Sequence, residues 1–149
     1  LGSNLGCREE LIRKAAELVP LEKKRLSSLY ESEPWRCPAG TPWFVNAALA
    51  GETKLPPEAL LLELKKIEGI LGRQNTARDP TNAYSSRSVD IDILFYDNLV
   101  HNSSGLIIPH PHIAQRRFVL VPLAEIGPEF ATVKNLLKQC THTSIVRAL

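Results

Sequence analysis

The 149-residue sequence lacks the features that mark several protein classes. It contains no Gly-x-x-x-x-Gly-Lys-Ser/Thr pattern, which excludes a P-loop, and no Gly-x-Gly-x-x-Gly pattern. No apolar run approaches the length of a membrane span, and no signal peptide is visible, so we expect no membrane partner. The formal net charge of +2 is too small to indicate a nucleic-acid partner.

Cysteine is scarce and methionine is absent. Cys7, Cys37 and Cys140 are odd in number and lack metal-ligand spacing, so we interpret them as reduced thiols in a cytoplasmic protein. The opening residues 1–4 are typical of the exit of a strand. We therefore expect that an N-terminal strand, and internal residues with it, are missing from the sequence. The length predicts a single domain over residues 1–149, which we expect to be a monomer.

The most informative stretch that is present covers residues 87–96. Its alternation of β-branched and aromatic residues predicts a strand with Asp90 and Asp92 on one face. The rise per residue separates these carboxylates by roughly 6 to 7 Å. Like charges at that distance favour a cation between them, most simply Mg²⁺. Arg87 adds a planar donor suited to phosphate, so the stretch predicts metal-assisted phosphate chemistry.

This motif alone leaves other interpretations open. A half-exposed strand with a polar face would show the same pattern. Metal-dependent glycosyltransferases and nucleases also use paired aspartates, and a non-catalytic nucleotide-binding domain is a further alternative. The basic side chains that follow the second helix, in residues 73–86, could belong to a solvated loop or to a functional one.

The remaining periodicity predicts an α+β protein. Helices are expected at 8–19, at 57–71, from Pro122 and at 133–139, and strands at 26–33, 44–52, 87–96 and near 106–108. With an upstream strand granted, the order is strand, helix, strand, strand, helix, strand. This order predicts a ferredoxin-like (split βαβ) antiparallel sheet with helices packed on one face and extra C-terminal helices.

Three kinds of residue outside the aspartate pair are candidates for a site. Asn46 lies within an apolar strand and needs a partner, either backbone or a ligand with amide-like edges. Phe44 and Phe118 are core residues in the simplest interpretation. His110 lies between two prolines that fix its backbone, and a metal-ligand role for it with His112 is an alternative.

In combination, the motifs resemble one family. They are Leu1 to Gly6, Glu33-Pro34-Trp35, Phe44 to Ala48, Ile67-Glu68 with Leu71-Gly72-Arg73, Ser86 to Leu94, Pro109-His110-Pro111, and Arg116 to Leu123. Together they resemble the 6-hydroxymethyl-7,8-dihydropterin pyrophosphokinases of folate biosynthesis, over residues 1 to about 130. The resemblance implies a transferase that moves pyrophosphate from ATP to the pterin hydroxymethyl group and releases AMP.

The resemblance also implies a role for particular residues. Asp90 and Asp92 would bind two Mg²⁺ ions and, with Arg73 and Arg87, form the catalytic set. The pterin would contact Ser32, Glu33, Trp35, Phe44, Asn46 and Phe118. ATP would contact Lys65, Arg73, Tyr84, Arg87, His110 and Arg116. The chain departs from the family pattern at Lys65, where some members have Gln, at Asn75, where many have a second Arg, and at Tyr84, near a position where some have Trp.

Overall fold

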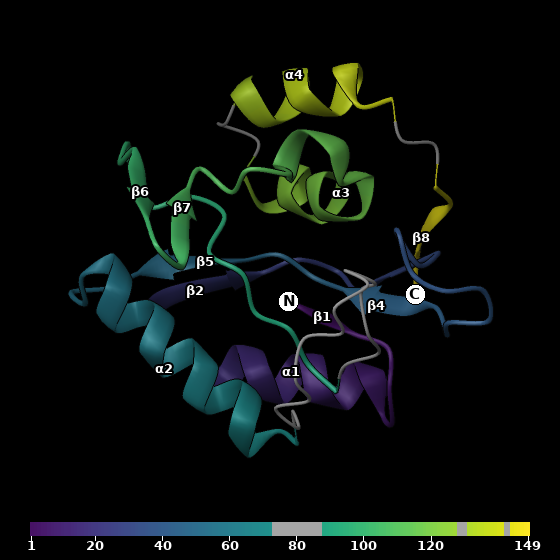
Figure 1. Cartoon of the computed structure of the whole chain (residues 1–149), viewed down its shortest axis with the longest axis horizontal. Helices are drawn as coiled ribbons and strands as arrows, with labels where there is room; N and C mark the ends of the chain where they lie inside the picture. Colours follow the sequence, from purple (N-terminus) through teal and green to yellow (C-terminus); the bar gives the residue numbers. More distant parts are fainter. Residues whose placement is uncertain (73–87, 128–130, 142–143) are drawn as a thin grey trace.

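The computed structural model describes residues 1–72, 88–127, 131–141 and 144–149. A β-sheet layer lies between two layers of helices (Figure 1). Helices α1 (Arg8–Leu18) and α2 (Pro57–Ile70) cover one face, and α3 (Arg117–Ile126) covers the other, with α4 (Ala131–Gln139) packed on α3. The prediction of an α+β protein with antiparallel sheets is confirmed. Among the described helices, none has the length and apolarity needed to cross a membrane.

The strands form three antiparallel sheets in the described part of the chain. The largest has the order β1 (Gly2–Ser3), β4 (Phe44–Asn46), β3 (Tyr30–Ser32) and β8 (Val146–Ala148). Strand β2 (Glu22–Leu26) pairs with β5 (Leu49–Glu52), and β6 (His101–Ser103) forms a hairpin with β7 (Leu106–Ile108). A short 3₁₀ helix (Ile113–Gln115) precedes α3.

The predicted helices at 8–19 and 57–71 are confirmed, whereas the single strands predicted at 26–33 and 44–52 are wrong. Each of these stretches is divided between two sheets. Leu26 pairs with Leu49 and Tyr30 with Asn46, so residues 27–29 lie opposite the shorter stretch 47–48. An extra residue on one side of a ladder breaks the pairing and bends the strand, as in a β-bulge. Helix α3 also begins earlier than predicted, at Arg117, and contains Pro122 within it.

The stretch with the strongest strand pattern alternates as predicted but does not form a named strand. Val89, Ile91 and Ile93 are buried, and Asp90 and Asp92 are more exposed. In the described part, its strand pairing is limited to one antiparallel bridge, between Asp90 and Gly2. The prediction of a full strand is wrong because the N–H of Ile91 donates to a side chain, and because residues 92–100 line a cavity.

Three buried clusters, on the two sides of the sheet, fix which face each residue presents. Val45 packs with Ile12 and Ala47 on the side of α1, whereas Ala48 packs with Leu120 on the side of α3. The buried residues of the 89–93 stretch pack with α1 and α2. Because side chains alternate along extended backbone, the intervening residues of both segments face the α3 side.

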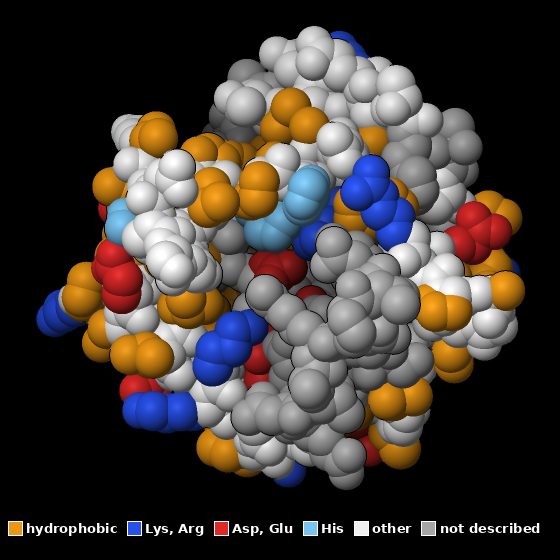
Figure 2. Space-filling view, viewed as in Figure 1, with side chains coloured by type: hydrophobic (Ala, Val, Ile, Leu, Met, Phe, Trp, Pro, Cys, Tyr) orange, Lys and Arg blue, Asp and Glu red, His pale blue; other side chains and the backbone are white. Residues whose placement is uncertain are grey.

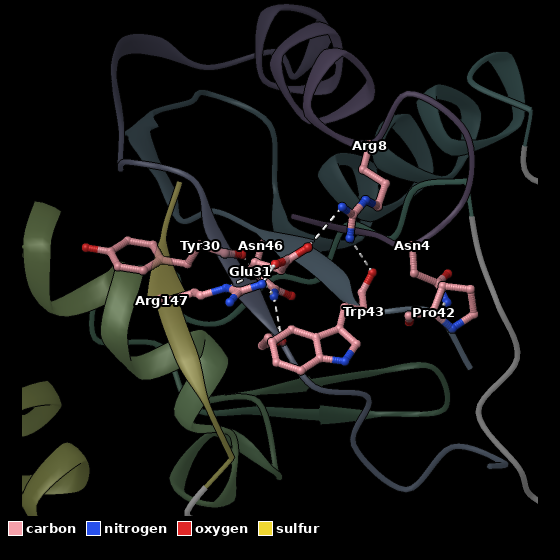
Figure 3. A network of polar contacts seen from close by, with 9 residues as sticks. Asn4, Arg8, Tyr30, Glu31, Pro42, Trp43, Asn46 and Arg147 are labelled. Carbon is pink, nitrogen blue, oxygen red and sulfur yellow. Dashed lines mark hydrogen bonds and ion pairs between the residues drawn. The ribbon is translucent and has the colours of Figure 1, made fainter. Parts of the chain in front are cut away.

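A carboxylate on the α1 side connects four parts of the fold. Glu31 of β3 accepts hydrogen bonds from Arg8 at 2.9 Å and from Arg147 of β8 at 2.6 Å (Figure 3). Arg8 also donates to the carbonyl of Trp43 at 2.7 Å, and the guanidinium of Arg147 lies 5.0 Å from the centre of the Trp43 ring. The hydrogen bond from Arg147 is the largest cause of a lowered pKa of Glu31, against an opposing effect of burial, and Arg8 lowers it further.

Replacing Glu31 by glutamine is expected to lower the free energy of unfolding by about 2 kcal/mol at neutral pH, since both arginines lose a charged acceptor. The pKa of Glu31 is lower in the folded protein than its ordinary value of 4.5. Its contribution is therefore complete above pH 4.5 and disappears as the pH falls through the folded-state pKa. Urea unfolding at several pH values should show the difference between variant and parent closing in acid.

The matched control is Glu52→Gln, which removes an exposed carboxylate paired with Lys23 at 2.8 Å. Exposed pairs contribute little, so this change should alter the free energy of unfolding by less than about 1 kcal/mol at any pH. Equal effects of the two substitutions would show that the Glu31 network does not stabilise the fold as argued.

Candidate active site

A row of polar side chains crosses the sheet on the face that α3 covers. Ser32 pairs directly with Phe44, and Tyr30 with Asn46, and directly paired residues share a face. The Tyr30 hydroxyl donates to Glu125 of α3 at 3.0 Å, which identifies this face as the α3 side. Ser32, Phe44 and Asn46 therefore all face the space beneath α3.

The aspartate pair belongs to the same face. Gly2 pairs with Asn46 on one side and with Asp90 on the other, so the row continues through Gly2 to Asp90. Gly2 contributes no side chain to this face. Asp92 lies two residues beyond Asp90 and, by alternation, on the same side. Residues that are far apart in the sequence are thus brought to one surface by antiparallel pairing.

These residues line one cavity of about 1340 Å³. Figure 2 shows acidic, histidine and basic side chains gathered around a hollow on one face of the molecule. The predicted site residues that line the cavity are Ser32, Glu33, Trp35, Phe44, Asn46, Asp90, Asp92, Arg116 and Phe118. This volume is larger than that of an ordinary single-ligand pocket.

Backbone hydrogen bonds at both ends hold the aspartate segment. The N–H and carbonyl of Asp90 bond with Gly2 at 2.8 and 2.9 Å, and the carbonyl of Leu94 accepts from the His110 N–H at 3.0 Å. Asp90 is partly exposed, and the side chain of Asp92 is 36% exposed. Both carboxylates are therefore fixed by their backbone and remain accessible from the cavity.

Asp92 lies beside two cationic or titratable partners. Arg116, whose side chain is only 10% exposed, donates to Asp92 Oδ2 at 3.2 Å, and His110 Nε2 lies 3.9 Å from the same oxygen. Burial, and then the neighbouring charge of Arg116, lower the pKa of His110, although Asp92 acts in the opposite direction. His110 Nδ1 accepts the N–H of His112 at 3.2 Å, and His110 Nε2 lies 3.4 Å from Arg116 Nη1.

Aromatic rings form one wall of the cavity. The ring of Trp35 lies 6.3 Å from that of Phe118, and the guanidinium of Arg116 lies 5.2 Å from the centre of the Trp35 ring. Phe44 and Phe118 are half-buried and line the cavity, so the interpretation of both as core residues is wrong. Half-buried rings that face a cavity present flat apolar surface to a planar ligand.

Asn46 has both a local partner and an open edge. Its amide nitrogen donates to Ser32 Oγ at 2.9 Å, and the residue is 5% exposed. The partners that the sequence required are therefore a neighbouring side chain and, at 3.5 Å, the backbone carbonyl of Tyr30. The bond to Ser32 fixes the orientation of the amide plane, while Asn46 still lines the cavity.

The donor set of the site suits a hard cation that also has ligands from a substrate. Across residues 1–72, 88–127, 131–141 and 144–149, no group of three or more His, Cys, Asp and Glu side chains could hold a metal ion. Magnesium is ordinarily bound by one or two carboxylates together with water and substrate phosphates. Asp90 and Asp92 supply those two carboxylates, so the residues present fit Mg²⁺, whereas a closed site of protein ligands such as His110 with His112 is not formed.

Some predicted site residues do not line the cavity, and others lie outside the residues that the structure describes. Lys65 lies on α2, where its ammonium group pairs with Glu68 at 3.0 Å, and is not among the lining residues. Arg73, Tyr84 and Arg87 lie outside the described residues. Sequence reasoning assigned no role to Glu68, whose carboxylate accepts from the Ile91 N–H at 2.8 Å. The sequence feature that indicates a buried role for Glu68 is its place at an apolar position of the helix, four residues after Leu64.

Comparison with known proteins identifies what the chain is similar to. Residues 1–128 match the family described as 7,8-dihydro-6-hydroxymethylpterin-pyrophosphokinase. A 2-amino-4-hydroxy-6-hydroxymethyldihydropteridine pyrophosphokinase of Methylorubrum extorquens is 34% identical, with 99% of this chain and 94% of that protein covered. The protein of the same name from Aquifex aeolicus is 38% identical, with 86% and 78% covered.

Other relatives are much longer than this chain. A folate synthesis bifunctional protein of Arabidopsis thaliana is 43% identical over 85% of this chain, but the match spans 26% of that protein. The chain likewise matches 17% of the folic acid synthesis protein fol1 of Pneumocystis carinii. The chain thus spans about a quarter or less of the length of these relatives.

Proposed function

The chain belongs to the 7,8-dihydro-6-hydroxymethylpterin-pyrophosphokinase family, and from this premise we propose that it transfers pyrophosphate from ATP to 6-hydroxymethyl-7,8-dihydropterin. The acceptor is the hydroxymethyl oxygen of the pterin, and the products are AMP and the pterin diphosphate. The reaction is a step of folate biosynthesis. Bacterial relatives with this activity in their names match most of their own length to this chain, which supports the proposal.

One observation carries the proposal: the paired carboxylates and the aromatic-amide pocket share a cavity. Asp90 and Asp92 lie in the same row as Asn46 and line the same cavity as Phe44 and Phe118. A simple nucleotide-binding domain would not need the second, aromatic pocket. A nuclease or glycosyltransferase that used the aspartate pair would not explain it either.

The metal requirement follows from the family and from the donor set. Two Mg²⁺ ions would supply Lewis-acid polarisation of the phosphates and of the attacking hydroxyl. Asp90 and Asp92 would hold them from the sheet. Arg116 keeps its guanidinium beside Asp92 and would donate to a phosphate oxygen there, and His110 would bind ATP beside it. Pyrophosphoryl transfer depends on such positioning and charge neutralisation rather than on a covalent intermediate.

The pterin pocket would use flat apolar surface and one polar edge. Phe44 and Phe118 would stack on the two faces of the ring, and Asn46 would hydrogen-bond its amide-like edge. Ser32 orients the Asn46 amide, and Glu33 and Trp35 complete the wall. Lys65, Arg73, Tyr84 and Arg87 stay predicted ATP contacts, and Arg73 and Arg87 stay predicted members of the catalytic set.

The pairing of the strands supports a ferredoxin-like sheet. A ferredoxin-like sheet places its first strand between its third and fourth, with every neighbour antiparallel. Gly2 is bridged to Asp90 on one side and to β4 on the other, and β4 pairs with β3, which is the order such a sheet requires. We propose that residues 1–149 form one catalytic domain of this type, monomeric and acting on small molecules in the cytoplasm.

Identification of the nucleotide product tests the proposal. Pyrophosphoryl transfer releases AMP, whereas transfer of the terminal phosphate releases ADP. Chromatography of a reaction containing ATP, Mg²⁺ and the hydroxymethyl pterin should therefore show AMP. ADP as the product would overturn the proposed reaction.

A further inference from the structure

Glu68 is a carboxylate at an apolar position of helix α2. Leu60 and Leu64 precede it at intervals of four, and both belong to the core between the helices and the sheet. Residues four apart lie on the same face of a helix. The side chain of Glu68 is likewise buried, with 1% exposed. A buried carboxylate is costly unless it is paired and hydrogen-bonded, so its partners indicate what it does.

The partners of Glu68 connect α2 to the peptide between the two aspartates. Glu68 Oε1 accepts the N–H of Ile91 at 2.8 Å. Lys65 Nζ donates to both carboxylate oxygens, at 3.2 and 3.0 Å. Ile91 is the residue between Asp90 and Asp92, so a shift of its peptide changes the direction and separation of both side chains.

Glu68 bonds to the edge of the aspartate segment that lies opposite to β1. Successive N–H groups of extended backbone point to opposite edges of a strand. The Asp90 N–H bonds to Gly2 on one edge, and the Ile91 N–H points to the other edge, where Glu68 takes the place of a neighbouring strand's carbonyl. The aspartate segment is thus held from both edges, by β1 and by α2.

We infer that Glu68 is a positioning residue for the metal-binding pair: its hydrogen bond to Ile91 sets the separation of the Asp90 and Asp92 carboxylates. This inference rests on the proposed function, because that proposal assigns Mg²⁺ to the two aspartates. Groups that orient metal ligands typically change metal affinity by about 10- to 100-fold when removed. The hydrogen bond, rather than the charge, is the feature that matters.

Two conservative substitutions separate hydrogen bond from charge. Glu68→Gln keeps an acceptor oxygen at the same reach but removes the charge. Glu68→Asp keeps the charge but shortens the side chain by one methylene, so the carboxylate no longer reaches the N–H of Ile91. Glu63→Gln is the matched control, since Glu63 lies on the same helix, paired with Lys66 at 2.7 Å and away from the aspartates.

Mn²⁺ titration of each variant, followed by paramagnetic broadening of the backbone amides of residues 88–96, measures metal binding without turnover. We expect Glu68→Asp to need about 10- to 100-fold more Mn²⁺, and Glu68→Gln to stay within about threefold of the parent. Pterin binding, followed by tryptophan fluorescence, should stay within about twofold in both, because β3, β4 and α3 supply that pocket.

Three results would overturn the inference: unchanged Mn²⁺ affinity in Glu68→Asp, equal loss in the Gln and Asp variants, or parallel loss of Mn²⁺ and pterin binding. The last result would indicate a general role in the fold. A parent protein that releases no AMP, yet shows the expected Mn²⁺ pattern, would refute the proposed function while leaving the positioning role intact.

Discussion

Replacing Asp92 by asparagine is expected to reduce pterin-dependent AMP release by about 10³-fold or more. The substitution removes the negative charge of a proposed Mg²⁺ ligand, and the electrostatic contribution of a bound cation to phosphoryl-type transfer is several kcal/mol. The fold should persist, because Asp92 is 36% exposed and asparagine retains an acceptor for Arg116. The measurement is the rate constant for AMP formation at saturating ATP and pterin, together with the thermal midpoint.

The control for this prediction is Glu63→Gln, which makes the same chemical change on the solvent side of α2. Its rate constant should stay within about twofold of the parent, as expected for a substitution away from special features. An Asp92→Asn protein that retained more than a tenth of the parent rate would contradict the metal assignment. If Asp92→Asn greatly lowers the thermal midpoint, the rate constant of Asp90→Asn should be compared with that of the parent instead.

Replacing Asn46 by alanine is expected to raise the dissociation constant for the pterin by about 10- to 100-fold. The loss of a buried hydrogen-bonding partner costs about 1–3 kcal/mol. The affinity for ATP should change by less than about threefold, since the ATP contacts we propose lie on other segments. Titration of tryptophan fluorescence follows pterin binding through Trp35, which lies beside Phe118.

Two further variants make this result specific. Ser32→Ala removes the acceptor that holds the Asn46 amide at 2.9 Å, and should weaken pterin binding by a smaller factor than Asn46→Ala. Asn102→Ala, on the exposed strand β6, should have no effect on either ligand. Equal loss of pterin and ATP binding in Asn46→Ala would point to misfolding rather than to lost recognition.

The sequence predicted helices α1 and α2 and the face of the aspartates because these depend on local periodicity. The apolar stripe of α2, with Leu60 and Leu64 buried, follows directly from spacing. The alternation of Val89, Asp90 and Ile91 likewise predicted which side chains are buried and which face the cavity. Neither feature requires knowledge of distant contacts.

The division of the strands was not predictable, because it depends on the pairing of distant residues. The break between β4 and β5 exists because residues 27–29 lie opposite residues 47–48, a mismatch that only the register reveals. Among the described residues, no ladder continues beside Asp92, and the segment lines the cavity there. The local pattern predicts the alternation of this segment but not which residues pair with it.

Within the site, the residues could be proposed from motifs, but their mutual support could not. Nothing in the local pattern places Arg116 at 3.2 Å from Asp92, or Ser32 at 2.9 Å from Asn46. Glu68 was missed because a glutamate on a helix is usually solvated, and only the burial of its neighbours at four-residue spacing shows otherwise.

Pterin-dependent AMP release is the most direct test that this cavity performs pyrophosphoryl transfer. The protein should be incubated with ATP and Mg²⁺, with and without 6-hydroxymethyl-7,8-dihydropterin, and AMP and pterin diphosphate should both be quantified. We expect equal amounts of the two products, and none without the pterin. AMP formation that does not depend on the pterin, or no AMP from protein that binds both ligands, would contradict this expectation.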